Sequence, residues 1–171
     1  MSLDSMHDLL LEELRDLYNA EQQLIKALPK IAEKVSTPSL RDAIETHYRE
    51  TEGHVVRLER IFGGLGEKSS GKKCKGMEGM LDEGEEMLSE KGSDSIRDAG
   101  IIAAAQRVEH YEIAGYGSAI AFAQLLGHQD IVTLLEETLA EEKAADEKLS
   151  AIAEEEVNQH AMAASGATHN Y

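Results

Sequence analysis

Hydrophobic residues recur every three or four positions along four long segments of the chain, which is the spacing of one face of an α-helix. The first segment begins at Asp4 or Ser5, either of which is a good N-cap, and runs to about Val35. Pro29 lies inside it, and we expect this proline to kink or locally break the helix because its nitrogen carries no hydrogen. The hydrophobic stripe of this segment consists of Leu10, Leu14, Leu17, Leu24 and Leu28.

The second segment has clear start and stop signals. Thr37-Pro38 is typical of an N-cap followed by a proline in the first turn of a helix. Gly63-Gly64 is expected to end the helix, because glycine is the usual residue just beyond a helix C-terminus.

The third and fourth segments follow the same rules. Ser93 or Asp94 predicts the N-cap of a long helix that runs to about Leu126. Asp130 predicts the N-cap of a fourth helix, which continues through Ile152.

A long connection separates the two helix pairs. Residues 65–75, with the sequence LGEKSSGKKCK, predict a loop, and a short helix is expected from about Met77 to Leu88. Two tightly joined helix pairs linked by one long crossover have the connectivity of ferritin-like four-helix bundles. We therefore predict an all-α, ferritin-like bundle in a single domain, residues 1–158. Residues 159–171 show no periodicity and predict a flexible C-terminal tail.

The balance of charges excludes several classes of partner. The chain has 17 basic and 33 acidic residues, a formal net charge of −16. Neutralising phosphate groups requires an excess of Lys and Arg, so the sequence predicts no nucleic-acid binding and no docking on anionic membranes.

Other features of the sequence favour a soluble, cytoplasmic protein. The first residues, MSLDSMHDLLLEE, lack the basic start and apolar run of a secretory signal. The longest uncharged stretch, 113–129, is too short to span a membrane, which requires about 20 residues. Cys74 is the only cysteine, so no intrachain disulfide can form and a reducing compartment is expected.

Acidic residues occupy positions at which the helical pattern requires a core residue. One such acid falls on the stripe of the first helix, and the other three long helices each carry two candidate ligands on or beside their stripe. The candidate metal ligands are Glu21, Glu50, His54, Glu109, Glu112, Glu142 and Asp146.

Several buried carboxylates in one core need compensation. An unpaired buried charge costs several kcal/mol, and neighbouring carboxylates also repel one another. The stripes contain no Lys or Arg, because Lys26, Arg57 and Lys148 fall on outer faces or edges. Carboxylates with an occasional imidazole suit iron or manganese, so the pattern predicts two metal ions per chain, with iron preferred over manganese.

The pattern departs from the usual di-metal bundle in two ways. Such bundles carry a single Glu on two helices and a Glu-x-x-His pair on each of the other two. Here both pairs, Glu50 with His54 and Glu142 with Asp146, are spaced by four residues, and the last member is Asp. Either spacing keeps the two side chains on one helix face.

Simpler interpretations stay open for individual residues. Glu21 could be a solvated edge residue, and His47 and His54 could be ordinary core histidines; His47 could equally be a ligand. Tyr116 could donate a hydrogen bond to the site, act as a radical partner, or be a half-buried interface residue. Cys74 could have a lowered pKa and redox activity because Lys72, Lys73 and Lys75 surround it, although a solvated loop explains the same cluster.

Five segments of the chain resemble the bacterial YciF-like proteins, a ferritin-like family associated with stress responses. They are ELRDLYNAEQQLIKALPKIAE, ETEGHVVRLERIF, KKCKGMEGM, RDAGIIAAAQRVEHYEIAGYG and EEKAADEKL, and they cover about residues 5–155 in order. The resemblance implies a ferritin-like bundle, a homodimer and a di-iron site. The positions that match are Glu21, Glu50, His54, Glu109, Glu142 and Asp146, with Glu112 as a further candidate.

Two functions follow as hypotheses. The first is a di-iron protein that oxidises Fe(II) or consumes O2 or peroxide. The second is a non-catalytic, structural stress protein that forms a helical homodimer with a polar core. Iron storage in a shell is less favoured, because the sequence shows no set of self-complementary interfaces.

Overall fold

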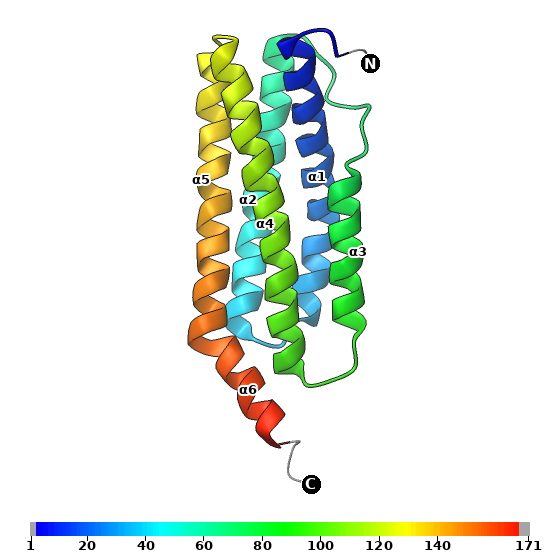
Figure 1. Ribbon diagram of the computed structural model, residues 1–171, viewed down its shortest axis with the longest axis vertical. Coiled ribbons are helices and arrows are strands. Elements are labelled where there is room, and N and C mark those ends of the chain that lie inside the picture. Colours follow the sequence, from blue (N-terminus) through cyan, green and yellow to red (C-terminus); the bar gives the residue numbers. More distant parts are fainter. Residues whose placement is uncertain (1–2, 168–171) are drawn as a thin grey trace.

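Four long helices lie side by side in the computed structural model, which describes residues 3–167 (Figure 1). A short helix, α3, packs against α1 and α4 within the long connection between α2 and α4. This arrangement confirms the predicted all-α bundle with one long crossover. No helix among the described residues is both long enough and apolar enough to cross a membrane. The helices are α1 (Met6–Lys34), α2 (Pro38–Leu65), α3 (Lys75–Ser89), α4 (Asp94–Leu125), α5 (Gln129–Ile152) and α6 (Asn158–Ala167), and a π-helical turn (Ala153–Val157) joins the last two.

Helix boundaries agree with the sequence signals at some ends and differ at others. Ser5 caps α1 by accepting a hydrogen bond from the Asp8 backbone nitrogen. The helix then continues through Pro29 to Lys34, so the predicted local break does not occur. Pro29 is exposed, and its ring therefore faces solvent rather than the core.

Two further boundary predictions were wrong by a few residues. Helix α2 runs past Gly63-Gly64 to Leu65, and its C-cap is Gly66, whose φ of 69° is in the left-handed region that glycine adopts without strain. Helix α5 starts at Gln129 after His128, and Asp130 lies in its first turn instead of capping it. A carboxylate in that first turn still favours the helix, because it faces the positive end of the helix dipole.

The chain continues in helical form beyond α5. Helix α6 (Asn158–Ala167) includes residues 159–167 of the predicted C-terminal tail, and this helix packs against α4. The last four residues of the tail, 168–171, lie outside the described residues.

A buried acid from α4 holds the tight turn between α1 and α2. Asp98 is fully buried and accepts hydrogen bonds from the backbone nitrogens of Ser36 and Thr37 and from the Thr37 hydroxyl group. Its partners are three groups that the turn leaves free, so this carboxylate is completely satisfied inside the protein.

The hydrophobic core consists of two parts. One part includes Leu14, Leu58 and Leu135, and the other includes Leu28 and Ile44, each with residues from all four long helices. The buried polar residues of α2 and α5, and Glu109 and Glu112 of α4, fall between the residues of these two apolar clusters, and Glu21 of α1 lies close to the boundary between the clusters. The bundle therefore contains a polar layer across its middle, and this layer holds the candidate site.

Candidate metal centre

Every long helix contributes side chains to the polar layer. Glu21 comes from α1, and α2 contributes His47, Thr51 and His54; the layer is completed by Glu109 and Glu112 of α4 and Glu142 of α5. All seven side chains are buried. The helical period explains why His47 and His54 of α2 both face the layer, because residues seven apart point in nearly the same direction after two turns.

Three of these residues form a first group that could hold an ion. The Nδ1 atom of His54 lies 3.2 Å from Oε1 of Glu21 and 3.0 Å from Oε1 of Glu142. One donor atom from each residue fits within 4.8 Å of the others, and all three side chains are completely buried. The group therefore offers two carboxylates and one imidazole to a single ion.

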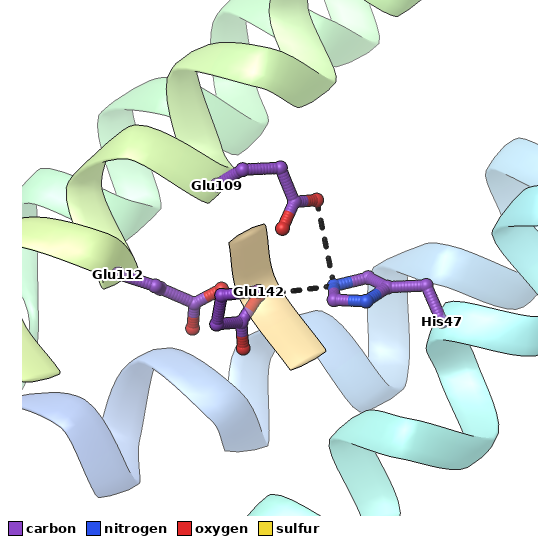
Figure 2. A group of neighbouring side chains, drawn as sticks. All are labelled: His47, Glu109, Glu112 and Glu142. Carbon is purple, nitrogen blue, oxygen red and sulfur yellow. Dashed lines mark ion pairs between the residues drawn. The ribbon is translucent and has the colours of Figure 1, made fainter. Parts of the chain in front are cut away.

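A second group adjoins the first and shares Glu142 with it. Figure 2 shows that His47, Glu109, Glu112 and Glu142 point toward one another. They come from α2, α4 and α5. The Nε2 atom of His47 lies 3.4 Å from Oε1 of Glu109 and 3.8 Å from Oε2 of Glu142. Because Glu142 belongs to both groups, the layer has the form of two adjacent sites with one carboxylate in common.

Many of the donor atoms of the layer lack hydrogen-bond partners. Within residues 3–167, every buried side-chain oxygen or nitrogen without such a partner belongs to this layer. Both oxygens of Glu112 are in this set, as are both oxygens of Glu142, and the close contact of Glu142 to His54 lacks the alignment of a hydrogen bond. A buried polar atom left without a partner costs about 1–3 kcal/mol. So many such atoms in one place indicate that something other than the protein satisfies them.

The electrostatics of the layer favour protons or cations. Burial raises the pKa of Glu109 and of Glu112 well above the usual range, and nearby carboxylates raise both further. Burial also raises the pKa of Glu142. Burial alone would lower the pKa of His54, but its contacts with Glu142 and Glu21 outweigh this and raise it to about 11. The layer therefore favours positive charge, which protons or metal ions could supply.

Two contacts orient the ligands of the first group. The Tyr116 hydroxyl group is completely buried and donates a hydrogen bond of 2.5 Å to Oε1 of Glu21. This confirms the interpretation of Tyr116 as a hydrogen-bond donor to the site. On the far side of the imidazole, Nε2 of His54 lies 2.9 Å from Oε2 of Glu141, which pairs with Arg57 through contacts of 2.6 and 2.8 Å.

Glu141 is a functional candidate that the sequence pattern missed. A carboxylate bound to the outer nitrogen of a histidine fixes the tautomer and orientation of the ring, which is how many metal-binding histidines are held. The signal in the sequence was weak: Glu141 precedes Glu142 on a helix rich in acids, and Arg57 follows His54 by one turn.

Two of the predicted site residues lie outside both groups. The Glu50 carboxylate is 3.5 Å from Nδ1 of His47 and about a third exposed. Asp146 accepts a hydrogen bond from Gln106 and lies 3.4 Å from Nε2 of His110. Glu50 follows His47 by three residues on α2. At about 100° per residue, its side chain therefore leaves the helix at about 60° from the direction of His47, which turns it away from the layer. The other five, Glu21, His54, Glu109, Glu112 and Glu142, are brought together.

A small cavity leads from the second group to the surface. It has a volume of about 110 Å³ and is lined by His47, Glu50 and Glu109, together with residues of α5 that include Lys148. Glu50 and Lys148 are in contact with solvent, so this cavity lies between the protein surface and the second group.

Cys74 belongs to a separate buried network. Its thiol group donates to Asp16 over 3.0 Å and lies 3.0 Å from the Tyr111 hydroxyl group. Burial raises the pKa of this thiol, and the adjacent Asp16 raises it further. The interpretation of Cys74 as a thiol activated by neighbouring lysines is therefore wrong. Cys74 instead caps α3, because its sulfur accepts a hydrogen bond from the Met77 backbone nitrogen.

Known proteins are similar to this chain over most of its length. Residues 5–162 match the family described as a domain of unknown function, DUF892. The chain is 40% identical over 162 residues to protein YciF of Escherichia coli strain K12, and the match covers 94% of this chain and 98% of YciF. The crystal structure of the E. coli stress protein YciF gives a TM-score of 0.87, covering 91% of this chain and 98% of that one.

Two other solved structures share the fold. YcfI from Rhodopseudomonas palustris, for which a structural role has been suggested, is 46% identical, with a TM-score of 0.85 over 87% of this chain and 95% of its own. Ferritin-like, diiron-carboxylate proteins from Bacillus anthracis strain Ames give a TM-score of 0.67 at 20% identity, over 89% and 99% of the two chains. At that identity the likeness establishes the fold alone.

Proposed function

The chain belongs to the DUF892 family, and we propose that its polar layer binds two metal ions, iron by preference, and reacts with O2 or peroxide. The single observation that carries this proposal is the set of buried, unpartnered donor atoms in the layer. The donors are carboxylate oxygens and imidazole nitrogens without a cysteine, which suits iron or manganese better than a structural zinc ion.

The charge of the layer supports two divalent ions. Four carboxylates, those of Glu21, Glu109, Glu112 and Glu142, carry four negative charges when ionised. Two divalent cations carry four positive charges, so the loaded layer is neutral with both histidines uncharged. Neutrality removes the cost of burying the carboxylates, which is the largest unfavourable contribution to this part of the core.

Each group of residues would hold one ion. Glu21, Nδ1 of His54 and Glu142 would hold the first, and His47, Glu109, Glu112 and the second oxygen of Glu142 would hold the other. Bound iron would supply the electrons that reduce O2 or peroxide.

The protein's own residues set the conditions for this chemistry. The Tyr116 hydroxyl group holds a proton against Glu21 and fixes the direction of that carboxylate. Glu141 and Arg57 fix the ring of His54. The cavity beside Glu50 admits a small oxidant on the side of the second group, whereas the first group is closed to solvent.

A role in stress responses is part of the same proposal. It is supported by the 40% identity to the E. coli protein that is described as a stress protein. A protein that consumes peroxide or oxidises Fe(II) would lower the supply of reactive oxygen species in a stressed cell. We propose a cytoplasmic location, which the single cysteine favours, and a homodimer, which the resemblance to the YciF-like proteins implies.

The test is anaerobic reconstitution with Fe(II), followed by measurement of bound iron per chain and of O2 or peroxide consumption. We expect two irons per chain in the unmodified protein and a loss of both iron and activity in Glu142→Gln, which removes the shared ligand. Glu147→Gln, an exposed position on the same helix, is the matched control and should behave as the unmodified protein does. Full iron content in Glu142→Gln would overturn the proposal.

The alternative is a non-catalytic structural protein. The observation in its favour is the structural role suggested for YcfI, which is 46% identical to this chain. This alternative predicts that Fe(II) neither binds with defined stoichiometry nor raises the melting temperature. The reconstitution experiment therefore separates the two functions.

A further inference from the structure

The polar layer contains one side chain on α2 that is neither a candidate metal ligand nor a support of one, that of Thr51. This side chain is completely buried, and its Oγ1 atom has no hydrogen-bond partner within residues 3–167. Thr51 follows His47 by four residues and precedes His54 by three, so its direction around the helix differs from theirs by about 40° and about 60°. Thr51 therefore faces the layer together with both histidines.

The other threonines inside the described helices show what Thr51 lacks. Thr46, Thr133 and Thr138 each donate to the backbone carbonyl four residues earlier, over 2.8, 3.1 and 3.5 Å. Such a bond within the helix satisfies the hydroxyl group of a helical threonine without any other partner. The corresponding carbonyl for Thr51 is that of His47, and the Thr51 hydroxyl group does not donate to it. This hydroxyl group is therefore available to a partner inside the layer.

The remaining groups of the layer that could donate a hydrogen bond already face an acceptor. The Tyr116 hydroxyl group donates to Oε1 of Glu21 over 2.5 Å. Both ring nitrogens of His54 face carboxylate oxygens, and so do both ring nitrogens of His47. In the part of the chain that the structure describes, Thr51 is thus the one donor of the layer that faces no acceptor.

The proposed reaction indicates the kind of acceptor that would satisfy this group. Two divalent ions and four ionised carboxylates leave the layer neutral, so loss of an electron from each ion would add two positive charges to it. An excess of buried charge is costly, and an anion that enters the layer reduces it. Because the Thr51 side chain is closed to solvent, only a small anion fits beside it.

We propose that Thr51 donates a hydrogen bond to a small anion of the hydroperoxide class, which binds in the polar layer together with the metal ions. The hydroxyl group orients the anion, because it fixes the place of one acceptor atom, and it takes no part in the transfer of electrons. This inference rests on the proposed function and deepens it, since it names the side chain that holds the oxidant.

The test measures the binding of azide to the iron-loaded protein after oxidation in air. Azide is a small anion with acceptor nitrogens, and its charge-transfer absorption with iron reports binding without any turnover. Thr51→Val keeps the shape of the side chain but removes the hydroxyl group, and we expect it to bind azide about tenfold to a hundredfold more weakly than the unmodified protein. Thr51→Ser restores the hydroxyl group and should bind azide nearly as tightly as the unmodified protein does.

Two controls separate the role of the hydroxyl group from effects on the fold and on metal content. Thr133→Val makes the same substitution at an exposed position of α5 and should leave azide affinity unchanged. Both Thr51 variants should bind as much iron as the unmodified protein. In the metal-free protein, Thr51→Val should raise the melting temperature, because it removes a buried hydroxyl group that has no partner.

Several results would overturn the inference while leaving the proposed function intact. The first is an unmodified protein that binds two irons but no azide, and the second is equal azide affinity in Thr51→Val and the unmodified protein. Azide binding by Thr51→Ser as weak as that by Thr51→Val would show a packing role, and a loss of iron from Thr51→Val would make the hydroxyl group part of the ion sites. A metal-free Thr51→Val with an unchanged or lower melting temperature would show that the hydroxyl group has a partner within the protein. An unmodified protein that binds no iron would refute the proposed function, and this inference with it.

Discussion

Asp16 and Glu112 are both buried acids at helix–helix contacts, but their surroundings are opposite. Asp16 accepts hydrogen bonds from Tyr111, over 2.5 Å, and from Cys74, and lies 3.3 Å from the ammonium group of Lys72. Neither oxygen of Glu112 has a hydrogen-bond partner. Burial alone would raise the pKa of Asp16, yet the groups around it hold that pKa below its usual value. The pKa of Glu112 is instead raised well above its usual range by burial and by neighbouring carboxylates.

The difference shows which feature of a buried acid indicates a ligand. Asp98 resembles Asp16, because its oxygens are satisfied by the turn between α1 and α2. Acids of this kind are structural, since the protein itself supplies what they need. The acids of the polar layer are unsatisfied, and they are gathered at a place where four helices meet. An unsatisfied set of donors, rather than burial as such, is the basis for proposing a metal centre.

The largest expected effect is the stabilisation of the folded protein by metal. Two sites filled at a hundred times their dissociation constant would together add about 5 kcal/mol to the free energy of unfolding. Differential scanning calorimetry with and without Fe(II), under anaerobic conditions, measures this as a rise in melting temperature. Asp16→Asn should show a rise of the same size from a lower starting point, whereas the rise should shrink in Glu112→Gln. An equal rise in Glu112→Gln would place the metal elsewhere.

The two acids should also give opposite dependences on pH in the metal-free protein. Because the pKa of Glu112 is raised in the folded state, stability is lost as the pH rises above its unfolded pKa of about 4.3. Glu112→Gln should therefore be more stable than the unmodified protein at pH 8, by about 3 kcal/mol, and this gain should vanish toward pH 4.

The pKa of Asp16 is lowered, so its contribution is present above the unfolded pKa of about 3.9 and is lost as the pH falls through the folded value. Asp16→Asn should then be destabilised from pH 5 to 8, with a cost that decreases in more acidic solution. Urea unfolding across this range gives both profiles. If Glu112→Gln were the less stable variant at pH 8, the comparison would fail.

A smaller effect is expected at Glu141, which supports the centre without belonging to either group. Glu141→Gln keeps the size of the side chain but weakens the contacts with His54 and Arg57. Loss of such a support lowers metal affinity about tenfold to a hundredfold, with stoichiometry unchanged. Glu137→Gln is the control, because Glu137 also contacts Arg57, at 3.3 Å, but does not reach His54. Metal titration of the two variants should therefore differ, and equal affinities would remove Glu141 from the account.

The smallest effect is expected in the buried network of Asp16, Cys74 and Tyr111. Tyr111→Phe removes the hydroxyl group that donates to Asp16 and should lower the free energy of unfolding by about 1 kcal/mol. Iron content should not change, because Tyr111 has no contact with the polar layer among the hydrogen bonds of residues 3–167. A loss of bound iron in this variant would show that the two regions are coupled.

Much of the fold could be predicted from the sequence, because the helical period of Leu and Ile residues is strong and the turn signals are clear. The acids at core positions stood out for the same reason. The choice between neighbouring positions could not be made in this way. Glu50, His54 and His47 all lie near one face of α2, and a rotation of about 40–60° decides which side chain reaches the centre.

The contacts between side chains of different helices also could not be predicted from the sequence pattern. Glu141 supports His54 because α5 packs against α2, and Asp98 reaches a turn more than 60 residues away in the chain. Cys74 was interpreted from its lysine neighbours in sequence, whereas its actual neighbours are Asp16 and Tyr111, from other helices. Spacing along one helix says little about such partners, because they depend on how the helices are rotated and stacked.

Anomalous scattering at the iron edge, from crystals grown with Fe(II), tests the central claim most directly. Two peaks are expected inside the polar layer. One should lie within bonding distance of Glu21, His54 and Glu142, and the other within bonding distance of His47, Glu109 and Glu112. An iron-loaded crystal with no peak in the layer, or with peaks only at surface carboxylates, would contradict it.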